Sequence, residues 1–222
     1  MSEHSMQAPA LAKEGLNMDA LAGQLLRLGT VVGVLGLTAA AFLGMQRGDG
    51  GAQLLHSYLL ALVYFLSLGL GALFFVTLQY LTRAGWSVVV RRIAEVLASS
   101  LPLLVVLFVP VLVSMLRGSS QLYIWVDKAL VAQDELLRGK QAYLNVPFFA
   151  ARLGVYFVIW TMMSRHYLKQ SVRQDQSGDL TITARLQSLS APGMALFALS
   201  TTFAAIDLLM SLHPHWYSTI FG

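Results

Sequence analysis

Five long apolar segments dominate this 222-residue chain and leave few folds open to it. Each is close to or above the roughly 20 mostly apolar residues that a membrane-spanning helix needs. Lipid offers the backbone no hydrogen-bond partners, so each segment must satisfy its own N–H and C=O groups as a helix. The regular alternation of apolar and polar residues that marks membrane-barrel strands is missing. The segments are 28–45, 55–81, 96–116, 146–163 and 191–212.

Composition supports this interpretation. Charged residues make up 12% of the chain and hydrophobic residues 56%, whereas soluble domains are about 25% charged. The sequence therefore predicts an all-α integral membrane protein with five transmembrane helices. Cysteine is absent, which excludes disulfides, thiolate-bound iron–sulfur clusters and covalent c-type haem on this chain.

The basic residues predict an orientation. The tail 1–27 lacks the basic start and cleavage pattern of a signal peptide, so we expect the first helix to be its own insertion signal. Five spans place more basic residues on the N-terminal side, which predicts a cytoplasmic N-terminus and an exterior C-terminus. The same rule explains the net charge of +4 without a nucleic-acid partner. The N-terminal side carries Lys13, Arg27, Arg83, Arg91, Arg92, Arg165, Lys169, Arg173 and Arg185, and the opposite side Arg47, Arg117, Lys128, Arg138 and Lys140.

Helix ends and bends are marked by capping residues and prolines. Asn145 and Ser190 each stand two residues before a proline, and their side chains could cap the free N–H groups of a helix that begins there. Pro102 and Pro110 lie within the third span and predict kinks in it.

Two loops are longer than simple connectors. Segment 117–145 predicts a short amphipathic helix lying on the exterior surface. Segment 164–190 predicts a polar turn followed by a short helical stretch. In the second span, Ser67 and Gly71 have the spacing of small residues at helix contacts, with Gly69 between them, and ordinary intramembrane packing is the favoured interpretation.

Asp207 lies inside the fifth apolar segment, where a carboxylate is costly unless it is neutralised, paired or hydrated. Ser200 and Ser211 stand seven residues before it and four after it, so the three share a helix face. One interpretation is a proton-relay carboxylate whose hydroxyl neighbours hold water. The other is a structural carboxylate satisfied by Arg152 or by interfacial solvent.

Arg152 lies in the second turn of the fourth span, and Tyr156 and Trp160 continue its face. The fourth span enters from the side at which the fifth span leaves, so Arg152 and Asp207 lie at nearly equal depth. Pairing would offset part of the cost of burying each ion. The alternative is an arginine that extends to the lipid headgroups alone.

Three histidines are predicted at the exterior mouth: His56, His213 and His215. A metal or b-type haem site could be built from them. Interfacial histidines beside Trp216 and Tyr217 are ordinary, and that interpretation is favoured. The sequence contains no phosphate loop, nucleophile elbow or HExxH pair, so we expect no catalysis by this chain alone.

Three stretches together resemble one family. They read HSYLLALVYFLSLGLGALFFVTLQYLTRAGWSVVVRRIAE (56–95), KQAYLNVPFFAARLGVYFVIW (140–160) and SAPGMALFALSTTFAAIDLLMSLHPHWYSTIFG (190–222). They are similar to the F subunit of bacterial alternative complex III, a quinol-oxidising respiratory complex. That subunit is related to the membrane subunit of polysulfide reductase, the NrfD-like group. The last stretch is the most specific.

The resemblance covers about 55–222 and implies a fold of two four-helix bundles in the bacterial inner membrane. This chain would supply a leading transmembrane helix and loop (28–54) and the first four-helix bundle (55–222), and the second bundle would lie beyond it or on another polypeptide. The family often has an acidic residue where this chain has His213, a departure that weakens any proton-uptake role at the exterior mouth.

The resemblance also implies partners: a sister NrfD-like subunit, an iron–sulfur subunit and cytochrome c subunits. Haem and iron–sulfur clusters would reside on these partners and quinone near the sister subunit, so this chain would bind no cofactor itself. Its role would be a scaffold and a proton path through Asp207, Arg152, Tyr156, Ser200 and Ser211. Two alternatives are a structural assembly subunit and a small secondary transporter, for which discontinuous helices or an inverted repeat are expected but not visible in the sequence.

Overall fold

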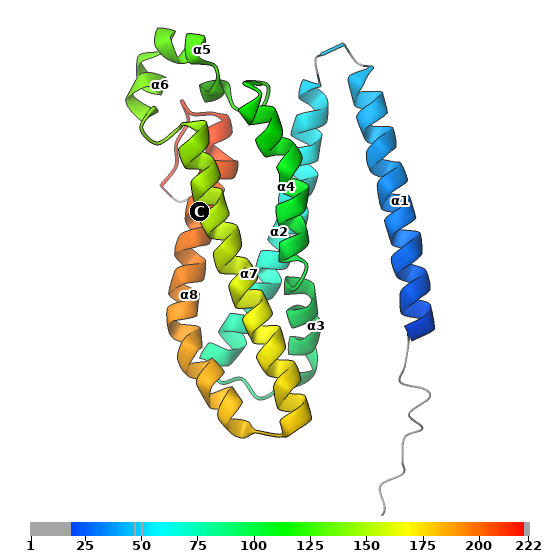
Figure 1. The fold of residues 1–222 in the computed structure, drawn as a ribbon. Helices are drawn as coiled ribbons and strands as arrows, with labels where there is room; N and C mark the ends of the chain where they lie inside the picture. Colours follow the sequence, from blue (N-terminus) through cyan, green and yellow to red (C-terminus); the bar gives the residue numbers. More distant parts are fainter. Residues whose placement is uncertain (1–18, 47, 50, 220–222) are drawn as a thin grey trace, which may run out of the picture. The chain divides into compact units, whose positions relative to one another are not determined.

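A computed structural model describes residues 19–46, 48–49 and 51–219 of the chain, and every regular element among them is helical. Five helical segments are long and apolar enough to cross a membrane, which confirms the predicted all-α membrane fold (Figure 1). The elements are α1 (Asp19–Met45), α2 (Ala52–Leu81), α3 (Val88–Ala98), α4 (Leu101–Leu116), η2 (Ile124–Val126), α5 (Lys128–Gln133), α6 (Glu135–Lys140), α7 (Val146–Ser177), α8 (Leu180–Leu208) and η3 (Met210–Leu212).

The chain divides into two compact units, Met1–Leu54 and Leu55–Gly222. The first contains α1, whose apolar side chains are exposed all round within the described residues. Thr30 and Thr38 donate hydrogen bonds to the carbonyls four residues earlier, so neither hydroxyl is left unsatisfied on an apolar helix. The helix begins at Asp19, well before the predicted start at residue 28, because the intervening residues are good helix formers although they are not all apolar.

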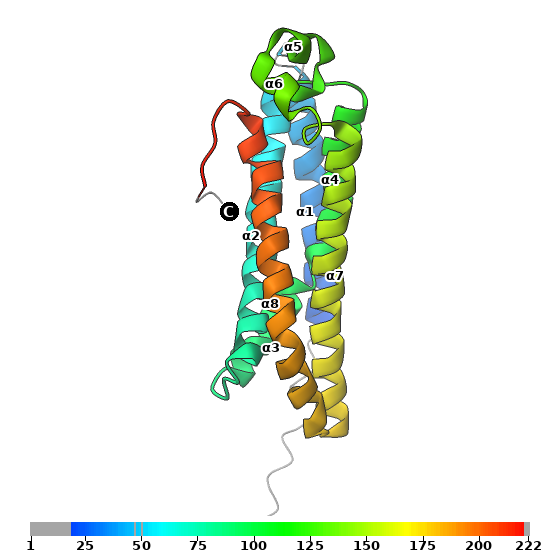
Figure 2. The same ribbon diagram turned by 90° about the vertical axis from the view of Figure 1, so that its left-hand side faces the viewer.

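The second unit is a bundle of α2, α3 with α4, α7 and α8 (Figures 1 and 2). Its core is built from fully buried side chains on each of these four spans, among them Leu73, Leu101, Phe149 and Trp160. One end of the bundle is covered by α5 and α6, and we call it the capped end. At the other end α7 turns directly into α8, and we call it the hairpin end.

The third span is broken in two. A turn at Ser99 and Ser100 separates α3 from α4, and both hydroxyls donate to carbonyls of the preceding turn, at 2.6 and 2.8 Å. The break replaces the kink predicted at Pro102, which lies in the first turn of α4, whereas α4 continues through Pro110. A discontinuous helix, not visible in the sequence, is therefore present in the structure. It is one of the two features expected of a transporter.

Close packing of the second span depends on Gly69. A Cβ atom there would lie 2.9 Å from Leu101 Cδ2, so with any other residue the Leu101 side chain would have to shift at the start of α4. Ser67 and Gly71 are exposed, and a Cβ at Gly71 would meet no described atom within 4 Å. The predicted pair of small residues is thus not a helix contact within the described chain.

The turn and the helical stretch predicted within 164–190 are both present, but the segment is a tight connection between two long helices and not a long loop. α7 continues to Ser177, Gly178 ends it in the left-handed conformation (φ +66°), and Asp179 caps α8 by accepting from the Thr181 N–H. Ser190 therefore does not cap a helix: it lies inside α8, and its hydroxyl donates to the Leu186 carbonyl. The predicted cap at Asn145 is confirmed, since its side chain accepts from the Phe148 N–H.

The capped end is covered by three short helical pieces in place of the single amphipathic helix predicted for 117–145. Asp127 and Asp134 cap α5 and α6 and so divide the segment. Tyr123 and Trp125 are buried in the bundle. The segment therefore closes the end of the bundle. Its largest aromatic side chains point into the bundle and not toward a membrane surface, as the predicted amphipathic helix would have required.

Candidate functional site

Asp207 and Arg152 form a buried ion pair at the capped end. Arg152 donates from Nε to Asp207 Oδ2 at 2.9 Å and from Nη2 to Oδ1 at 2.8 Å. The Asp207 side chain is fully buried and that of Arg152 is 11% exposed. The tight turn between α7 and α8 makes the helices antiparallel, which brings the second turn of α7 level with the last turn of α8. The predicted pair is therefore present, in the bidentate geometry that strengthens arginine–carboxylate contacts.

Further partners complete the hydrogen bonding of both ions. The Tyr156 hydroxyl donates to Asp207 Oδ2 at 2.9 Å, and Arg152 Nη1 donates to the Tyr143 carbonyl at 3.0 Å. The guanidinium also lies over the rings of Tyr143 and Phe148, with its carbon 3.8 and 4.3 Å from their centroids. A desolvated cation against two aromatic faces is stabilised by their quadrupoles, so Arg152 would keep partners even without Asp207.

Tyr143 links the ion pair to the capped end. Burial, followed by the charge of Asp207, raises the pKa of Tyr143 to about 12. Its hydroxyl is buried and makes no hydrogen bond of normal geometry with a described residue. Tyr143 also lines a mainly apolar pocket of about 230 Å³ together with Lys140, Ser211 and Trp216. The same side chain thus borders both a pocket and the guanidinium of Arg152.

Ser211 and Ser200 do not contact the Asp207 carboxylate. The Ser211 hydroxyl donates to the Asp207 backbone carbonyl at 2.5 Å. Ser200 lies about two turns deeper, where it accepts from Trp160 Nε1 at 3.0 Å and donates to the Phe197 carbonyl. Ser200, Asp207 and Ser211 share one helix face, as predicted, but only Asp207 takes part in the ion pair.

The capped-end segment also holds the end of α8. Tyr123 donates from its hydroxyl to the Leu208 carbonyl at 3.0 Å, and Trp125 from Nε1 to the Ser211 carbonyl at 3.2 Å. Both bonds satisfy carbonyls that a helix end leaves without partners. Asp207 is therefore fixed from two directions: through its side chain by α7, and through the backbone around it by the capped-end segment.

The three histidines do not form a metal site with other side chains of the described chain. No group of three or more His, Cys, Asp or Glu residues there is placed to hold a metal ion. His215 pairs through Nε2 with Asp134 Oδ2 at 2.6 Å, and His56 and His213 are exposed. The pKa of the Asp134 carboxyl is lowered, first by the Leu137 N–H that it accepts and further by His215.

A second buried carboxylate, Glu95, lies at the hairpin end and was not predicted. Arg92 donates to Glu95 Oε2 at 3.1 Å, and Arg91 Nε lies 3.6 Å from Oε1. The Tyr80 hydroxyl of α2 donates to Oε1 at 3.4 Å. Arg92 also binds Asp175 of α7. The apolar segment predicted as the third span starts one residue after Glu95, although arginines three and four residues before a glutamate are a signal of a helical ion pair.

Buried polar side chains lie along one face of α7 between these two carboxylates. Trp160 bonds to Ser200, and the hydroxyls of Tyr167 and Ser190 lie 3.2 Å apart. Ser200 and Ser190 are ten residues apart on α8, or about 15 Å along the helix, so these pairs do not form one unbroken hydrogen-bonded chain. The buried polar residues on α7, spaced by three or four, are Tyr156, Trp160, Ser164, Tyr167 and Ser171.

Comparison with known proteins adds no assignment. No protein-family model matches the chain, and no curated protein matches its sequence at a significant level.

Proposed function

We propose that this chain is a membrane subunit of a quinol-oxidising respiratory complex of the alternative complex III type, where it acts as a scaffold and provides a proton path. The proposal is supported by the three sequence stretches that resemble the family and by the five apolar helices. The observation that carries the proton path is Asp207, a fully buried carboxylate held by Arg152 and Tyr156.

The proposed path uses a carboxylate that can exchange its partner. Protonation of Asp207 would remove its charge and weaken both bonds from Arg152. The guanidinium would remain held by the Tyr143 carbonyl and by two aromatic rings, so the cost of opening the pair is reduced. A proton released from Asp207 would pass to the Tyr156 hydroxyl and then along the buried polar face of α7. Water would have to bridge the gap of about 15 Å between Ser200 and Ser190.

In the predicted orientation this path runs from the exterior, at the capped end, to the cytoplasm, at the hairpin end. Glu95 with Arg91 and Arg92 would form its cytoplasmic end. In the proposed complex, partner subunits carry haem and iron–sulfur clusters and a sister subunit binds quinone. The chemistry assigned to this chain is therefore proton movement and positioning, with electron transfer elsewhere.

The test is Asp207→Asn in the purified native complex. Asparagine keeps the size and part of the hydrogen bonding of Asp207 but cannot be ionised, so assembly should persist while fewer protons move per quinol oxidised. The control is Glu135→Gln, which removes an exposed carboxylate at the same end. An assembled complex with an unchanged proton-to-quinol ratio would exclude Asp207 from the path.

A structural clamp is the second candidate. It is favoured by the completeness of the contacts, because Arg152 and Asp207 hold each other through two bonds and join α7 to α8. For a clamp, Asp207→Asn would lower the yield of complex, and each assembled complex would turn over and move protons normally. Measuring yield and coupling on the same preparations separates the two roles.

A further inference from the structure

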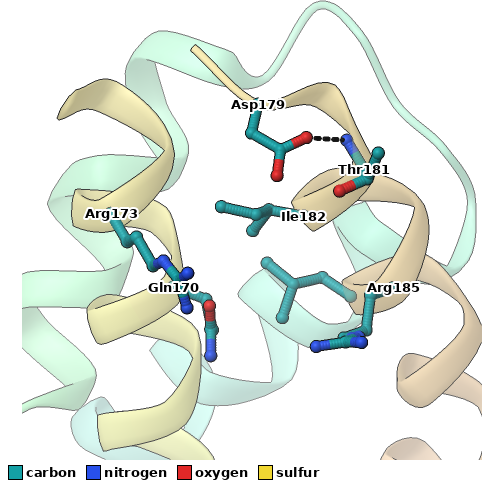
Figure 3. A pocket seen from close by; sticks show the side chains of 7 residues that line it. Gln170, Arg173, Asp179, Thr181, Ile182 and Arg185 are labelled. Atoms are coloured by element: carbon teal, nitrogen blue, oxygen red, sulfur yellow. Dashed lines mark hydrogen bonds between the residues drawn. The ribbon is translucent and has the colours of Figure 1, made fainter. Parts of the chain in front are cut away.

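The hairpin end carries a polar pocket of about 320 Å³ between α7 and α8 (Figure 3). Arg173 from α7 and Arg185 from α8 extend into the same space from opposite walls, and the Gln170 amide lies beside Arg173. Ile182 lies between the two arginines. Two guanidinium groups and an amide that converge on one space are the donors that bind a phosphate group.

The charge of this pocket is positive. Neither Arg173 nor Arg185 makes a salt bridge with a described residue. Asp179, also in the pocket, is exposed, and its carboxylate accepts from the Thr181 N–H at 2.9 Å. The Thr181 side chain, followed by its N–H, lowers the pKa of Asp179, with smaller contributions from the two arginines. One carboxylate already engaged as a helix cap does not neutralise two arginines.

A second, apolar pocket of about 550 Å³ follows the first along the same pair of helices. Met162 and Met163 line it from α7, and Leu189, Gly193 and Leu196 line it from α8. Its polar lining consists of cationic or titratable side chains toward the hairpin end, which are Arg165, His166, Tyr167 and Lys169. The described residues that line the two pockets include four Lys or Arg side chains and one carboxylate, which gives a formal charge of +3.

The two pockets are parts of one groove. On α8 their lining residues follow one another by three or four positions, which keeps them on a single helix face. The same holds on α7, where the lining continues from Ile159 through His166 and Gln170 to Arg173. On α8 the groove extends from Ile182 to Leu196, which is about 21 Å. That length exceeds the thickness of one hydrocarbon leaflet, about 15 Å, by enough for a headgroup.

We propose that this groove binds one anionic phospholipid, with its phosphate between Arg173 and Arg185 and an acyl chain against the apolar lining. A polar, positively charged end that continues into an apolar channel of about 10 Å on α8 matches such a lipid in both charge and shape. Basic pockets between transmembrane helices on the cytoplasmic side bind anionic headgroups on the same physical grounds. In the predicted orientation the site faces the cytoplasmic leaflet. The inference does not depend on the proposed respiratory role.

The experiment is native mass spectrometry of the detergent-purified full chain, titrated with phosphatidylglycerol or with phosphatidylcholine of the same acyl chains. We expect one phosphatidylglycerol to bind in preference to phosphatidylcholine. Replacing both arginines, Arg173→Gln with Arg185→Gln, should weaken phosphatidylglycerol binding about thirty-fold. The matched control, Arg27→Gln with Arg83→Gln, removes two exposed basic residues of the same predicted membrane side and should leave binding unchanged.

Two further arms identify the ligand and test for misfolding. Leu189→Trp should fill the apolar part of the groove and weaken lipid binding, and Arg173→Lys with Arg185→Lys should keep most of it. Equal retention of phosphatidylglycerol in the glutamine and control variants would overturn the proposal, as would equal binding of the two lipids. Full displacement of the lipid by inorganic phosphate, with no effect of Leu189→Trp, would assign the arginines to a free anion and would also overturn it.

Discussion

Among its described residues the bundle buries one carboxylate near each end, and the two are satisfied in different ways. Asp207 at the capped end is bound by Arg152 and Tyr156, both from another helix and more than fifty residues away in sequence. Glu95 at the hairpin end is bound mainly by arginines one turn earlier on its own helix. The side chain of Arg92 is 33% exposed, whereas that of Arg152 is 11% exposed.

This difference separates a contact between helices from a contact within one. The pair at Asp207 joins α7 to α8, so its loss affects tertiary structure and leaves a buried ion without its partner. The pair at Glu95 forms wherever α3 is helical, and of its two arginines Arg92 reaches solvent, whereas the Arg91 side chain is 14% exposed. Burial and the origin of the partner, more than the charge itself, should then determine how much each site contributes to the stability of the bundle.

The largest effect is expected for Arg152→Leu. It leaves the buried carboxylate of Asp207 without its cation, and breaking a buried pair in this way costs about 3–5 kcal/mol. The free energy of unfolding in detergent micelles measures the loss. Arg138→Leu, at an exposed position of the same end, should change it little.

The double variant Arg152→Leu with Asp207→Leu tests the reason for that effect. Apolar residues in place of both ions remove the uncompensated charge, so the double variant should be more stable than Arg152→Leu alone. A double variant less stable than both single variants would show that the ions contribute through their other partners, and the contrast with Glu95 would lose its basis.

How far the sequence predicts this fold depends on what each segment contacts. The five spans were predictable because lipid selects directly for apolar residues. The continuation of α7 from residue 164 to Ser177 was not, since outside the hydrocarbon a helix can be polar and its hydropathy no longer distinguishes it from a loop. Pro192 was misleading for a related reason: a proline typical of a first turn is also tolerated inside a transmembrane helix.

The candidate site, too, contains residues that the sequence could place and residues that it could not. Arg152 and Asp207 could be paired from sequence because antiparallel neighbours place residues at countable depths. Tyr143 and Trp125 could not be placed, since their positions depend on the fold of the capped-end segment, which is set by Asp127 and Asp134 as helix caps. Glu95 was missed because hydropathy starts the third span at residue 96, whereas α3 begins at Val88 and its first turns are charged.

A smaller effect is expected for Glu95→Gln. The amide keeps an acceptor for Tyr80, and Arg92 keeps Asp175, so the loss should be about 1 kcal/mol, near the net value of one hydrogen bond. The free energy of unfolding in detergent micelles again measures the loss. Gln174→Glu is not used as a control because Gln174 bonds to Thr183. The exposed Glu135→Gln is the matched control. A loss as large as that of Arg152→Leu would mean that Glu95 is also a contact on which the helix arrangement depends.

The smallest effect concerns Asp134, a solvent-facing carboxylate at the capped end. Its pKa is lowered from 3.8 in the folded protein, mainly by the Leu137 N–H. A group with a lowered folded pKa stabilises the fold above its unfolded pKa, and this contribution is lost as pH falls through the folded pKa.

Protection of the Leu136 and Leu137 amides against hydrogen exchange, corrected for intrinsic rates, should therefore fall only below about pH 3.8. Asp134→Asn supplies a cap that does not titrate, so its protection should be independent of pH over the same range. Equal pH dependence in both proteins would mean that another group controls this end of α6. The partly exposed Asp134 could then not serve as the reference for the two buried carboxylates.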